Sequence, residues 1–271
     1  MKTVIVTGAG QGIGRALALG FAQAGWSVCA TDLRKIEETA VLLGEGHLCL
    51  AGDVTEIAFP AQVVEAAAEK FGRLDCIVNN AADQRGTTLE ETPVALFDQI
   101  QAVNVRAPYL FAQAGLEHLK ATKGSIINLG SLVGNQPIPE RVAYSTSKAA
   151  LAGLTRALAT DIGRYGIRVN CIAPGHIMTS GEAAWRERFS PEEQRVFFTH
   201  YPLDRVGHPE EIAAVALFLA SDAASFLTGA TIPVDGGMSI LCPETGAFRA
   251  AGVNWPGNPG GATSSPSSAG R

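Results

Sequence analysis

Short apolar runs rich in β-branched residues recur along the chain, and amphipathic helical patterns fill the stretches between them. Most runs are apolar at nearly every position, which is typical of strands covered by helices on both faces of a parallel sheet. The alternation predicts an α/β fold: a single-domain, Rossmann-type doubly wound parallel sheet of about seven strands, with helices on both faces. The expected strands are residues 3–7, 27–31, 48–51, 76–79, 125–129, 168–172 and 231–234.

Helical periodicity and length point to a second set of segments. Thr92-Pro93 offers an N-cap followed by Pro at the first helical position, and residues 190–193 have the pattern of a capping box. The expected helices are residues 16–24, 36–43, 61–71, 93–119, 142–164 and 210–220.

The composition changes after Cys242, where Gly, Pro, Ser and Ala dominate and apolar anchors are few. Such a segment buries too little surface to offset its ordering entropy. We therefore expect a catalytic domain over residues 1–242 and a flexible tail over 243–271, either mobile or ordered against a neighbouring subunit.

Composition and charge exclude several functional classes. With 46% hydrophobic and 17% charged residues, the chain can bury a substantial core. A formal net charge of −5 offers no basic field for nucleic acid or anionic lipid. The N-terminus carries no signal-peptide pattern, and no apolar run reaches the roughly 20 residues of a membrane span. With no CxxC pair among its cysteines, the protein is expected to be soluble and cytoplasmic, without nucleic-acid or membrane partners.

A glycine-rich turn, TGAGQGIG at residues 7–14, follows the first expected strand and leads into a helix. Its glycines permit a tight turn and let the backbone approach a pyrophosphate at the positive end of that helix. The alternative is an ordinary glycine-rich turn between a strand and a helix. The residues expected to contact a dinucleotide are Gly8, Gln11, Gly12, Ile13 and Gly14.

Asp32 ends the second expected strand, where a carboxylate can accept hydrogen bonds from both hydroxyls of the adenosine ribose. It would also repel a 2′-phosphate, which favours NAD over NADP. Arg15 and Arg34 lie close by and could soften that preference. The alternative role for Asp32 is an N-cap of the helix over residues 36–43.

Short polar and small residues follow the third and fourth expected strands. Ligands of such sheets bind at the carboxyl ends of strands, so these residues are placed to meet adenine and ribose. Each could equally be part of a turn. The residues concerned are Asp53, Val54, Asn80, Ala81 and Ala82.

Tyr144 and Lys148 are four residues apart in an expected helix and therefore share a face. A nearby cation favours the phenolate and lowers the pKa of a tyrosine toward the range useful for acid–base catalysis. Such pairs are common on solvated helix surfaces. Ser131, at the end of the strand over 125–129, could hold a substrate oxygen beside the phenol or could bond its own turn. Asn104 is a polar residue within a helix, an unfavourable position that suggests a structural or catalytic purpose.

Taken together, these residues resemble the short-chain dehydrogenase/reductase family over about residues 3–240. Each motif is weak alone, but their order and spacing are highly specific. The family usually has Gly where this chain has Ala82, so we expect a small local shift there. The motifs are residues 7–14, Asp32, Asp53, NNAA at 79–82, Asn104, Ser131, YSTSK at 144–148 and PGHIMT at 174–179.

The resemblance implies roles for four residues. Tyr144 would be the general acid/base, and Ser131 would hydrogen-bond the carbonyl or alcohol oxygen of the substrate. Lys148 would lower the pKa of Tyr144 and hold the nicotinamide ribose. Asn104 would anchor a water molecule in a proton relay to solvent.

The resemblance also implies surroundings for the cofactor and a quaternary structure. The nicotinamide would be lined by Pro174, Gly175, Ile177 and Thr179, the last two near its carboxamide. Members of the family are commonly homotetramers or homodimers, built here on the helices over 93–119 and 142–164.

The segment over residues 180–205 is the expected substrate lid. Its aromatic and basic side chains face a substrate or, as the alternative, belong to amphipathic helices that pack on the body of the protein. Polar and cationic groups around one opening suggest a small sugar, polyol or hydroxy acid. The substrate candidates are Arg85, Gln136, Arg141, His176 and Trp185.

The sequence therefore predicts an NAD(H)-dependent oxidoreductase that interconverts a secondary alcohol and a ketone, or a sugar hemiacetal and its lactone. A 3-oxoacyl thioester reductase is an alternative, although such reductases usually prefer NADPH, which Asp32 opposes. A nucleotide-binding scaffold without chemistry would have no reason to keep four catalytic residues together. No metal is expected, because the five histidines are scattered.

Overall fold

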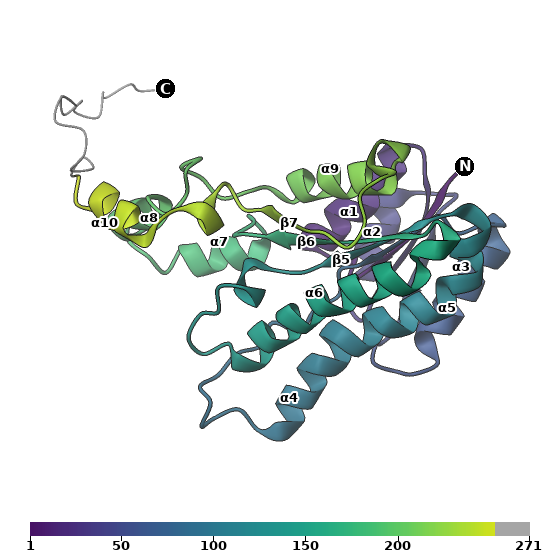
Figure 1. Cartoon of the computed structure of the whole chain (residues 1–271), viewed down its shortest axis with the longest axis horizontal. Helices are drawn as coiled ribbons and strands as arrows, with labels where there is room; N and C mark the ends of the chain where they lie inside the picture. The colour runs from purple at the N-terminus through teal and green to yellow at the C-terminus, as the bar shows by residue number, and fades with distance from the viewer. Residues whose placement is uncertain (253–271) are drawn as a thin grey trace.

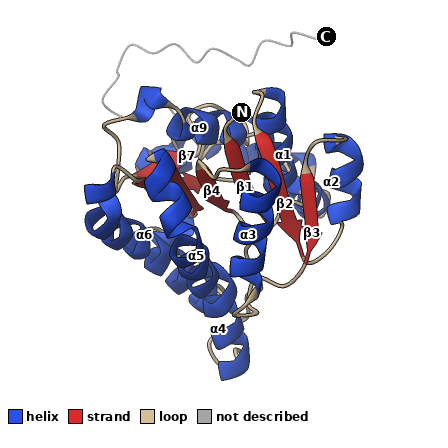
Figure 2. Cartoon of the chain, turned by 90° about the vertical axis from the view of Figure 1, so that its right-hand side faces the viewer, coloured by secondary structure: helices blue, strands red, loops and turns tan. Residues whose placement is uncertain are grey.

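The computed structural model contains one parallel sheet of seven strands within its described residues, 1–252, of which the side chains at 182, 185, 186 and 243 are left aside. The strands follow the order β3-β2-β1-β4-β5-β6-β7, and helices cover both faces, which confirms the predicted fold (Figures 1 and 2). The strands are β1 (Thr3–Thr7), β2 (Ser27–Asp32), β3 (Leu48–Ala51), β4 (Cys76–Asn79), β5 (Ser125–Leu129), β6 (Arg168–Pro174) and β7 (Thr231–Val234).

The order of the strands reverses between β1 and β4, which are direct neighbours. Val6 pairs with Val78, so the loops that follow Thr7 and Asn79 leave the sheet from adjacent points. In open α/β sheets a ligand crevice forms at the carboxyl ends of the strands at such a reversal. This edge of the sheet is therefore where the fold places a site.

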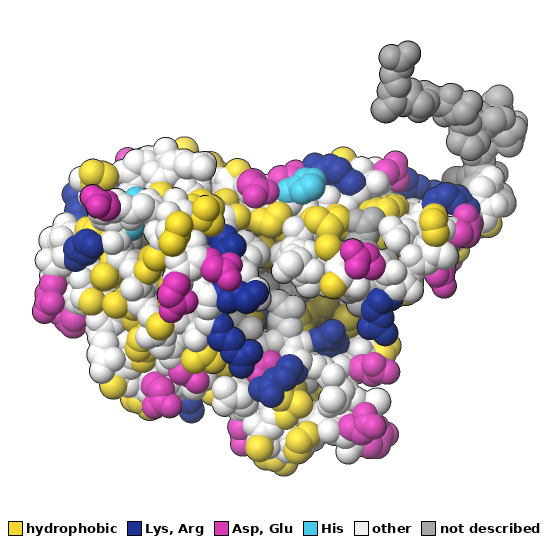
Figure 3. Space-filling model, turned by 180° about the vertical axis from the view of Figure 1, so that it is seen from behind, with side chains coloured by type: hydrophobic (Ala, Val, Ile, Leu, Met, Phe, Trp, Pro, Cys, Tyr) yellow, Lys and Arg dark blue, Asp and Glu magenta, His cyan; other side chains and the backbone are white. Residues whose placement is uncertain are grey.

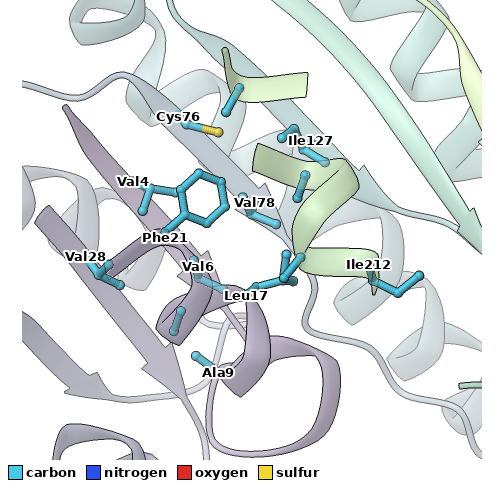
Figure 4. Packing of buried hydrophobic residues seen from close by; sticks show 14 of the residues in the cluster. Val4, Val6, Ala9, Leu17, Phe21, Val28, Cys76, Val78, Ile127 and Ile212 are labelled. Carbon is cyan, nitrogen blue, oxygen red and sulfur yellow. The ribbon is translucent and has the colours of Figure 1, made fainter. Parts of the chain in front are cut away.

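Alternate residues of β1 point to opposite faces of the sheet. Val4 and Val6 join the core under α1 and α9 (Figure 4), whereas Ile5 joins the core under α3, α5 and α6. Gly20 brings α1 close to α9, since an added Cβ would lie 3.2 Å from the Cβ of Ala213. The helices are α1 (Gly12–Gln23), α2 (Ile36–Leu43), α3 (Phe59–Phe71), α4 (Val94–Gln101), α5 (Ala107–Thr122), α6 (Val142–Ile162), α7 (Ser180–Arg186), α8 (Pro191–Phe198), α9 (Pro209–Ala220) and α10 (Pro243–Ala250). Over the described residues, no helix combines the length and apolar character that a membrane crossing needs.

The segment expected as one helix over 93–119 is interrupted by a π-helical turn. Helix α4 passes through this turn, Ala102–Arg106, before continuing as α5. Such turns are rare, and they occur frequently at functional sites. Asn104 lies in the turn and is buried.

The C-terminal segment differs from the expectation at residues 243–250, which form helix α10 rather than part of a flexible tail. The guanidinium of Arg249 donates to the carbonyl of Tyr201 at 3.2 Å and pairs with the carboxylate of Asp204. These polar anchors lie at the end of the predicted lid. Gly246 of the same helix is buried against His200, and Phe248 is half-buried, so packing as well as polar contacts holds α10. Helix α10 also meets the end of α8 (Figure 1), where the hydroxyl of Thr199 donates to the carbonyl of Gly246 at 3.5 Å. Residues 253–271 of the predicted tail lie outside the described residues.

Buried polar side chains link β4, β5 and α6. The amide nitrogen of Asn79 donates to Asn128 Oδ1 at 2.9 Å, and the amide nitrogen of Asn128 donates to Thr155 Oγ1 at 2.9 Å. Thr155 in turn donates to the carbonyl of Leu151 at 2.9 Å. The side chains of Asn79, Asn128 and Thr155 are all buried. Breaking one of their hydrogen bonds would leave a polar group without a partner in a low dielectric.

We predict that Thr155→Val lowers the free energy of unfolding by about 1–3 kcal/mol, because it removes the buried acceptor of Asn128. Thr31→Val is the matched control: Thr31 is equally buried, but its hydroxyl has no hydrogen-bond partner among the described residues. The control should be neutral or stabilising. Urea unfolding measures both values, and equal losses in the two variants would contradict the prediction.

Candidate active site

The glycine turn lies at the end of β1 and packs against the loop that follows β4. Gly8 (φ +65°) and Gly12 (φ +53°) have left-handed backbone angles, which residues with a Cβ rarely adopt. A Cβ on Gly14 would lie 1.9 Å from the carbonyl oxygen of Gly8, and one on Gly8 would lie 2.7 Å from the Cα of Ala81. The turn is therefore a bare backbone cradle at the start of α1, which fits a pyrophosphate.

Two further residues of the predicted turn differ in exposure. Gln11 stands exposed directly before α1, whereas Ile13 packs against the apolar core between the sheet and α1. Contact of either residue with a dinucleotide stays a prediction.

Asn80 holds the glycine turn from the end of the neighbouring strand. Its amide nitrogen donates to the carbonyls of Thr7 at 3.0 Å and Gly8 at 2.9 Å. The hydroxyl of Thr7 accepts the backbone N–H groups of Asn80 and Ala81, each at 3.0 Å. Both donors of the Asn80 side chain are thus used to fix the turn. Its predicted contact with adenine or ribose would have to use its side-chain oxygen or its backbone. Ala82 follows half-buried in the same loop.

Asp32 faces the glycine turn at the end of β2. Its carboxylate accepts the N–H of Gly10 at 2.8 Å and the N–H of Arg34 at 3.0 Å. The N-cap position of α2 is occupied by Lys35, so the alternative role of Asp32 as that cap is wrong. A carboxylate has about four acceptor positions, which leaves room for ribose hydroxyls.

Asp53 is engaged in a turn after β3, as the alternative interpretation of this residue foresaw. One carboxylate oxygen accepts both the N–H and the hydroxyl of Thr55 at 2.8 Å. Val54 is buried in the core under α3 and α5. A contact of either residue with adenine stays a prediction.

The segment after β6 approaches the glycine turn from the other side. A Cβ on Gly12 would lie 3.2 Å from a methyl carbon of Thr179, and one on Gly175 would lie 2.9 Å from the Cα of Asp235. Ile177 is buried and pairs with Gly207 in a short parallel bridge, and Pro174 ends β6. The structure thus brings Thr179 beside the cradle.

Lys148 carries a buried ammonium group at the centre of this edge. The residue is 3% exposed, and its Nζ donates to the carbonyl of Leu129 at the end of β5 at 2.7 Å. The same Nζ lies 5.6 Å from the centre of the Tyr144 ring. Gly134 allows the turn that begins at Ser131 to approach α6 here, since an added Cβ would lie 3.0 Å from backbone atoms of Lys148.

Burial dominates the acid–base properties of these groups. It lowers the pKa of Lys148 to about 8, because a charged ammonium is poorly solvated there. It also raises the pKa of Tyr144, while a hydrogen bond with the Ser131 side chain and the charge of Arg141 act in the opposite direction. In this arrangement desolvation of Tyr144 outweighs the hydrogen bond and the charge of Arg141. A lowering of the Tyr144 pKa by Lys148 stays a prediction.

Asn104 joins three parts of the site through its side chain. Its Oδ1 accepts the N–H of Asp83 at 2.8 Å, and its amide nitrogen donates to the Asp83 carbonyl at 3.0 Å and to Ser147 Oγ at 2.8 Å. Ser147 donates in turn to the carbonyl of Tyr144 at 2.7 Å. Asn104 therefore ties the π-helical turn, the loop after β4 and the start of α6 together. Its anchoring of a water molecule stays a prediction.

The substrate candidates mostly have partners within the protein. Arg85 forms a bidentate ion pair with Asp83, and Gln136 donates to the carbonyl of Ser239 at 3.0 Å. Arg141 donates to the carbonyl of Gln84, and His176 packs edge-on against Phe197 with 4.9 Å between ring centres. The side chain of Trp185 is not among those described. Figure 3 shows Lys and Arg side chains gathered beside a hollow on one face of the molecule.

A separate cavity of about 410 Å³ lies between the end of the lid, α9 and the end of β7. Ile177 lines it, as does the ion pair between Arg205 and Glu211. Ser131, Tyr144 and Lys148 are not among its lining residues. In the part of the chain that the structure describes, no cluster of three or more His, Cys, Asp or Glu side chains could hold a metal ion.

Several residues that shape the site were not singled out by sequence reasoning. Thr7 and Ser147 are central to its hydrogen bonds, although both lie inside the quoted motifs. Asp83 contributes backbone atoms, and Leu129 contributes its carbonyl. The type of a residue does not indicate which side chain will bind its backbone, so these contacts could be found only in the folded structure.

Comparison with known proteins places the chain in a family. Residues 8–239 match the family model described as "Enoyl-(Acyl carrier protein) reductase". An "Uncharacterized oxidoreductase" of Thermotoga maritima is 42% identical over 249 residues, which cover 89% of this chain and 98% of that protein. The "L-fucose dehydrogenase" of Oryctolagus cuniculus is 36% identical, with 93% of this chain and 90% of the relative covered.

A solved structure agrees with these relatives. It is the 3-ketoacyl-(acyl-carrier-protein) reductase from Brucella melitensis complexed with NADH, with a TM-score of 0.80 and 31% identity over 88% of this chain and 98% of that chain. The chain belongs to the short-chain dehydrogenase/reductase family, as its motifs suggested. It is an oxidoreductase of that family acting on CH–OH groups.

We predict that Lys148→Met stabilises the cofactor-free protein by about 1–3 kcal/mol at pH 7. The pKa of Lys148 falls from 10.5 to about 8 on folding. Below pH 8 the buried ammonium is charged and lowers the free energy of unfolding of the native state. That penalty disappears as the pH rises from about 8 to 10.5, and the gain of the variant should shrink accordingly.

Lys70→Met is the matched control, because exposed Lys70 likewise donates to a backbone carbonyl, that of His47, at 2.7 Å. Its effect on unfolding should stay within about 0.5 kcal/mol. Denaturant titrations at pH 7 and pH 10 measure these differences. A loss of stability in Lys148→Met at pH 7 would show that burial of the ammonium is not costly.

Proposed function

We propose that the protein is an NAD(H)-dependent dehydrogenase that interconverts a secondary alcohol and a ketone, or a sugar hemiacetal and its lactone, on a small polar substrate. A sugar, polyol or hydroxy acid is the proposed substrate class. The observation that carries this proposal is the buried Lys148 ammonium beside the Tyr144 phenol, at the edge that also holds the glycine cradle. The similarity to a protein named L-fucose dehydrogenase supports a polar substrate.

A nicotinamide dinucleotide fits the residues at this edge. The turn with Gly8, Gly12 and Gly14 would hold the pyrophosphate, and Asp32 would hold the adenosine ribose. Lys148 makes one hydrogen bond to the protein among the described residues, whereas an ammonium has three donors. Its remaining donors suit the hydroxyls of the nicotinamide ribose. NAD is favoured over NADP because Asp32 would repel a 2′-phosphate.

The proposed catalytic residues act on the substrate oxygen. When bound, the nicotinamide supplies the hydride chemistry. The protonated phenol of Tyr144, favoured by the raised pKa, would give its proton to a carbonyl oxygen during reduction and take it back during oxidation. Ser131, whose hydroxyl accepts the N–H of Val133 at 3.4 Å, would hold the same oxygen, and Asn104 would keep α6 in place.

A 3-oxoacyl thioester reductase is the second candidate, favoured by the similarity to the Brucella 3-ketoacyl reductase. Asp32 would repel the 2′-phosphate of NADPH, so it counts against this function only if the activity requires NADPH. Rates with NADH and NADPH on a 3-oxoacyl thioester and on polar alcohols separate the two functions.

We also propose a homodimer or homotetramer in the cytoplasm. Apolar side chains are exposed on the long helices, among them Val94, Tyr109 and Val142. Phe226, before β7, is fully exposed as well. All five cysteines are free thiols, which suits a reducing compartment. Light scattering measures the oligomeric state.

We predict that Tyr144→Phe lowers kcat by at least about 100-fold, because it removes the proton donor, and changes the Kd of NADH by less than about threefold. Tyr165→Phe, a substitution in the turn after α6, is the matched control and should keep full activity. The assay follows NADH absorbance with sugars, polyols, hydroxy acids and simple secondary alcohols. Persisting turnover in Tyr144→Phe would refute the mechanism, and activity confined to long aliphatic alcohols would refute the substrate class.

A further inference from the structure

Arg15 lies in the first turn of α1, beside the glycine cradle, and its guanidinium is held on three sides. Nε donates to Thr39 Oγ1 at 3.1 Å, and Nη2 donates to the carbonyl of Gly10. The same Nη2 pairs with the carboxylate of Glu38 at 2.6 Å. The cation that could soften the preference for NAD is therefore already bound by α2.

The contacts continue into the glycine turn. Thr39 is fully buried and donates to the carbonyl of Ala9 at 2.8 Å while it accepts from Arg15. The position of the guanidinium is thus fixed by a buried hydroxyl as well as by the ion pair. A guanidinium fixed in this way can bind few other groups, because its N–H donors point in fixed directions.

Gly10 connects this cation to the carboxylate proposed to hold the adenosine ribose. Its N–H donates to Asp32 at 2.8 Å, and its carbonyl accepts from Arg15. The guanidinium and the Asp32 carboxylate therefore bind the two polar groups of one residue. A phosphate on the ribose 2′-oxygen would lie in the combined field of Asp32, Arg15 and Glu38.

We propose that Glu38 is a specificity-determining residue, which weakens binding of a 2′-phosphorylated dinucleotide by neutralising Arg15 and holding it on the glycine turn. This inference rests on the proposed function in one respect, that a nicotinamide dinucleotide binds at this edge. Glu38 acts together with Asp32: the Asp32 carboxylate repels the phosphate directly, and the Glu38 carboxylate removes one positive partner, Arg15.

The charge state of Glu38 agrees with this role. The hydrogen bond from Arg15 is the largest influence and holds the pKa of the Glu38 carboxyl below its ordinary value, with added effects of the Arg15 and Lys35 charges. The carboxylate is therefore ionised throughout the neutral range. Arg34 and Lys35 are further cations near Asp32, but they are unchanged in the variants below, so their contributions cancel.

The test measures the Kd of NADH and NADPH for the full chain by isothermal titration calorimetry. Glu38→Gln keeps the shape of the side chain and removes its charge, and it should lower the Kd of NADPH roughly tenfold while changing that of NADH less than about twofold. Glu37→Gln is the matched control: Glu37 is an exposed carboxylate on the same helix, with no ion pair among the described residues. It should change either Kd less than about twofold.

Adding Arg15→Gln to Glu38→Gln should abolish the gain for NADPH, because the guanidinium whose charge Glu38 no longer neutralises is then absent. Equal gains in Glu38→Gln and Glu37→Gln, or a gain that survives Arg15→Gln, would overturn the proposal. Glu38→Ala, with thermal unfolding as a check of the fold, repeats the test with a second side chain. If wild type bound NADPH as tightly as NADH, the proposed NAD preference would fail, whereas the difference between the two Gln variants would still decide the role of Glu38.

Discussion

The burial of the Lys148 ammonium is the constraint on which the rest of the site depends. Removing a charge from water is costly unless it is well paired. Here the main compensation is one carbonyl, that of Leu129, because the neighbouring Cys171 is buried and its pKa is raised by desolvation. The structure therefore holds a cation that is under-solvated before any ligand arrives. A ligand hydroxyl that hydrogen-bonds this ammonium would bind more tightly, because the ammonium has already lost its water on folding.

Such a group has to be held in place by the surrounding elements. Asn128 and Thr155 fasten the middle of α6 to the sheet, and Asn104 fastens its start to the loop after β4. The π-helical turn places Asn104 between these segments without ending the long helix. The helix α6 itself places Tyr144 and Lys148 on one face, and the π-helical turn lets Asn104 hold the start of that helix.

The sheet could be predicted because most strands are nearly continuous apolar runs, a pattern typical of buried parallel strands. The glycine turn could be predicted because only glycine has the freedom its angles need. By contrast, the helix over 93–119 has continuous periodicity. Asn104 could be singled out there as a polar residue, but the π-helical turn around it could not be predicted. Helix α10 was missed because a composition poor in apolar residues does not reveal the polar contacts of Arg249 that help to anchor it.

Which charged side chains pair with each other is the feature of the site that the sequence predicts least well. Arg15 and Arg85 are both cations near the proposed ligand, yet each is bound by a carboxylate, Glu38 and Asp83 respectively. A basic residue at a mouth therefore does not by itself indicate an anionic ligand, since the field there is set by the pair. The same reasoning applies to Asp32, whose effect on a 2′-phosphate depends on whether Arg15 is free. If Glu38 acts as proposed, cofactor preference at this edge would depend on three side chains on β2, α1 and α2 rather than on one acidic residue.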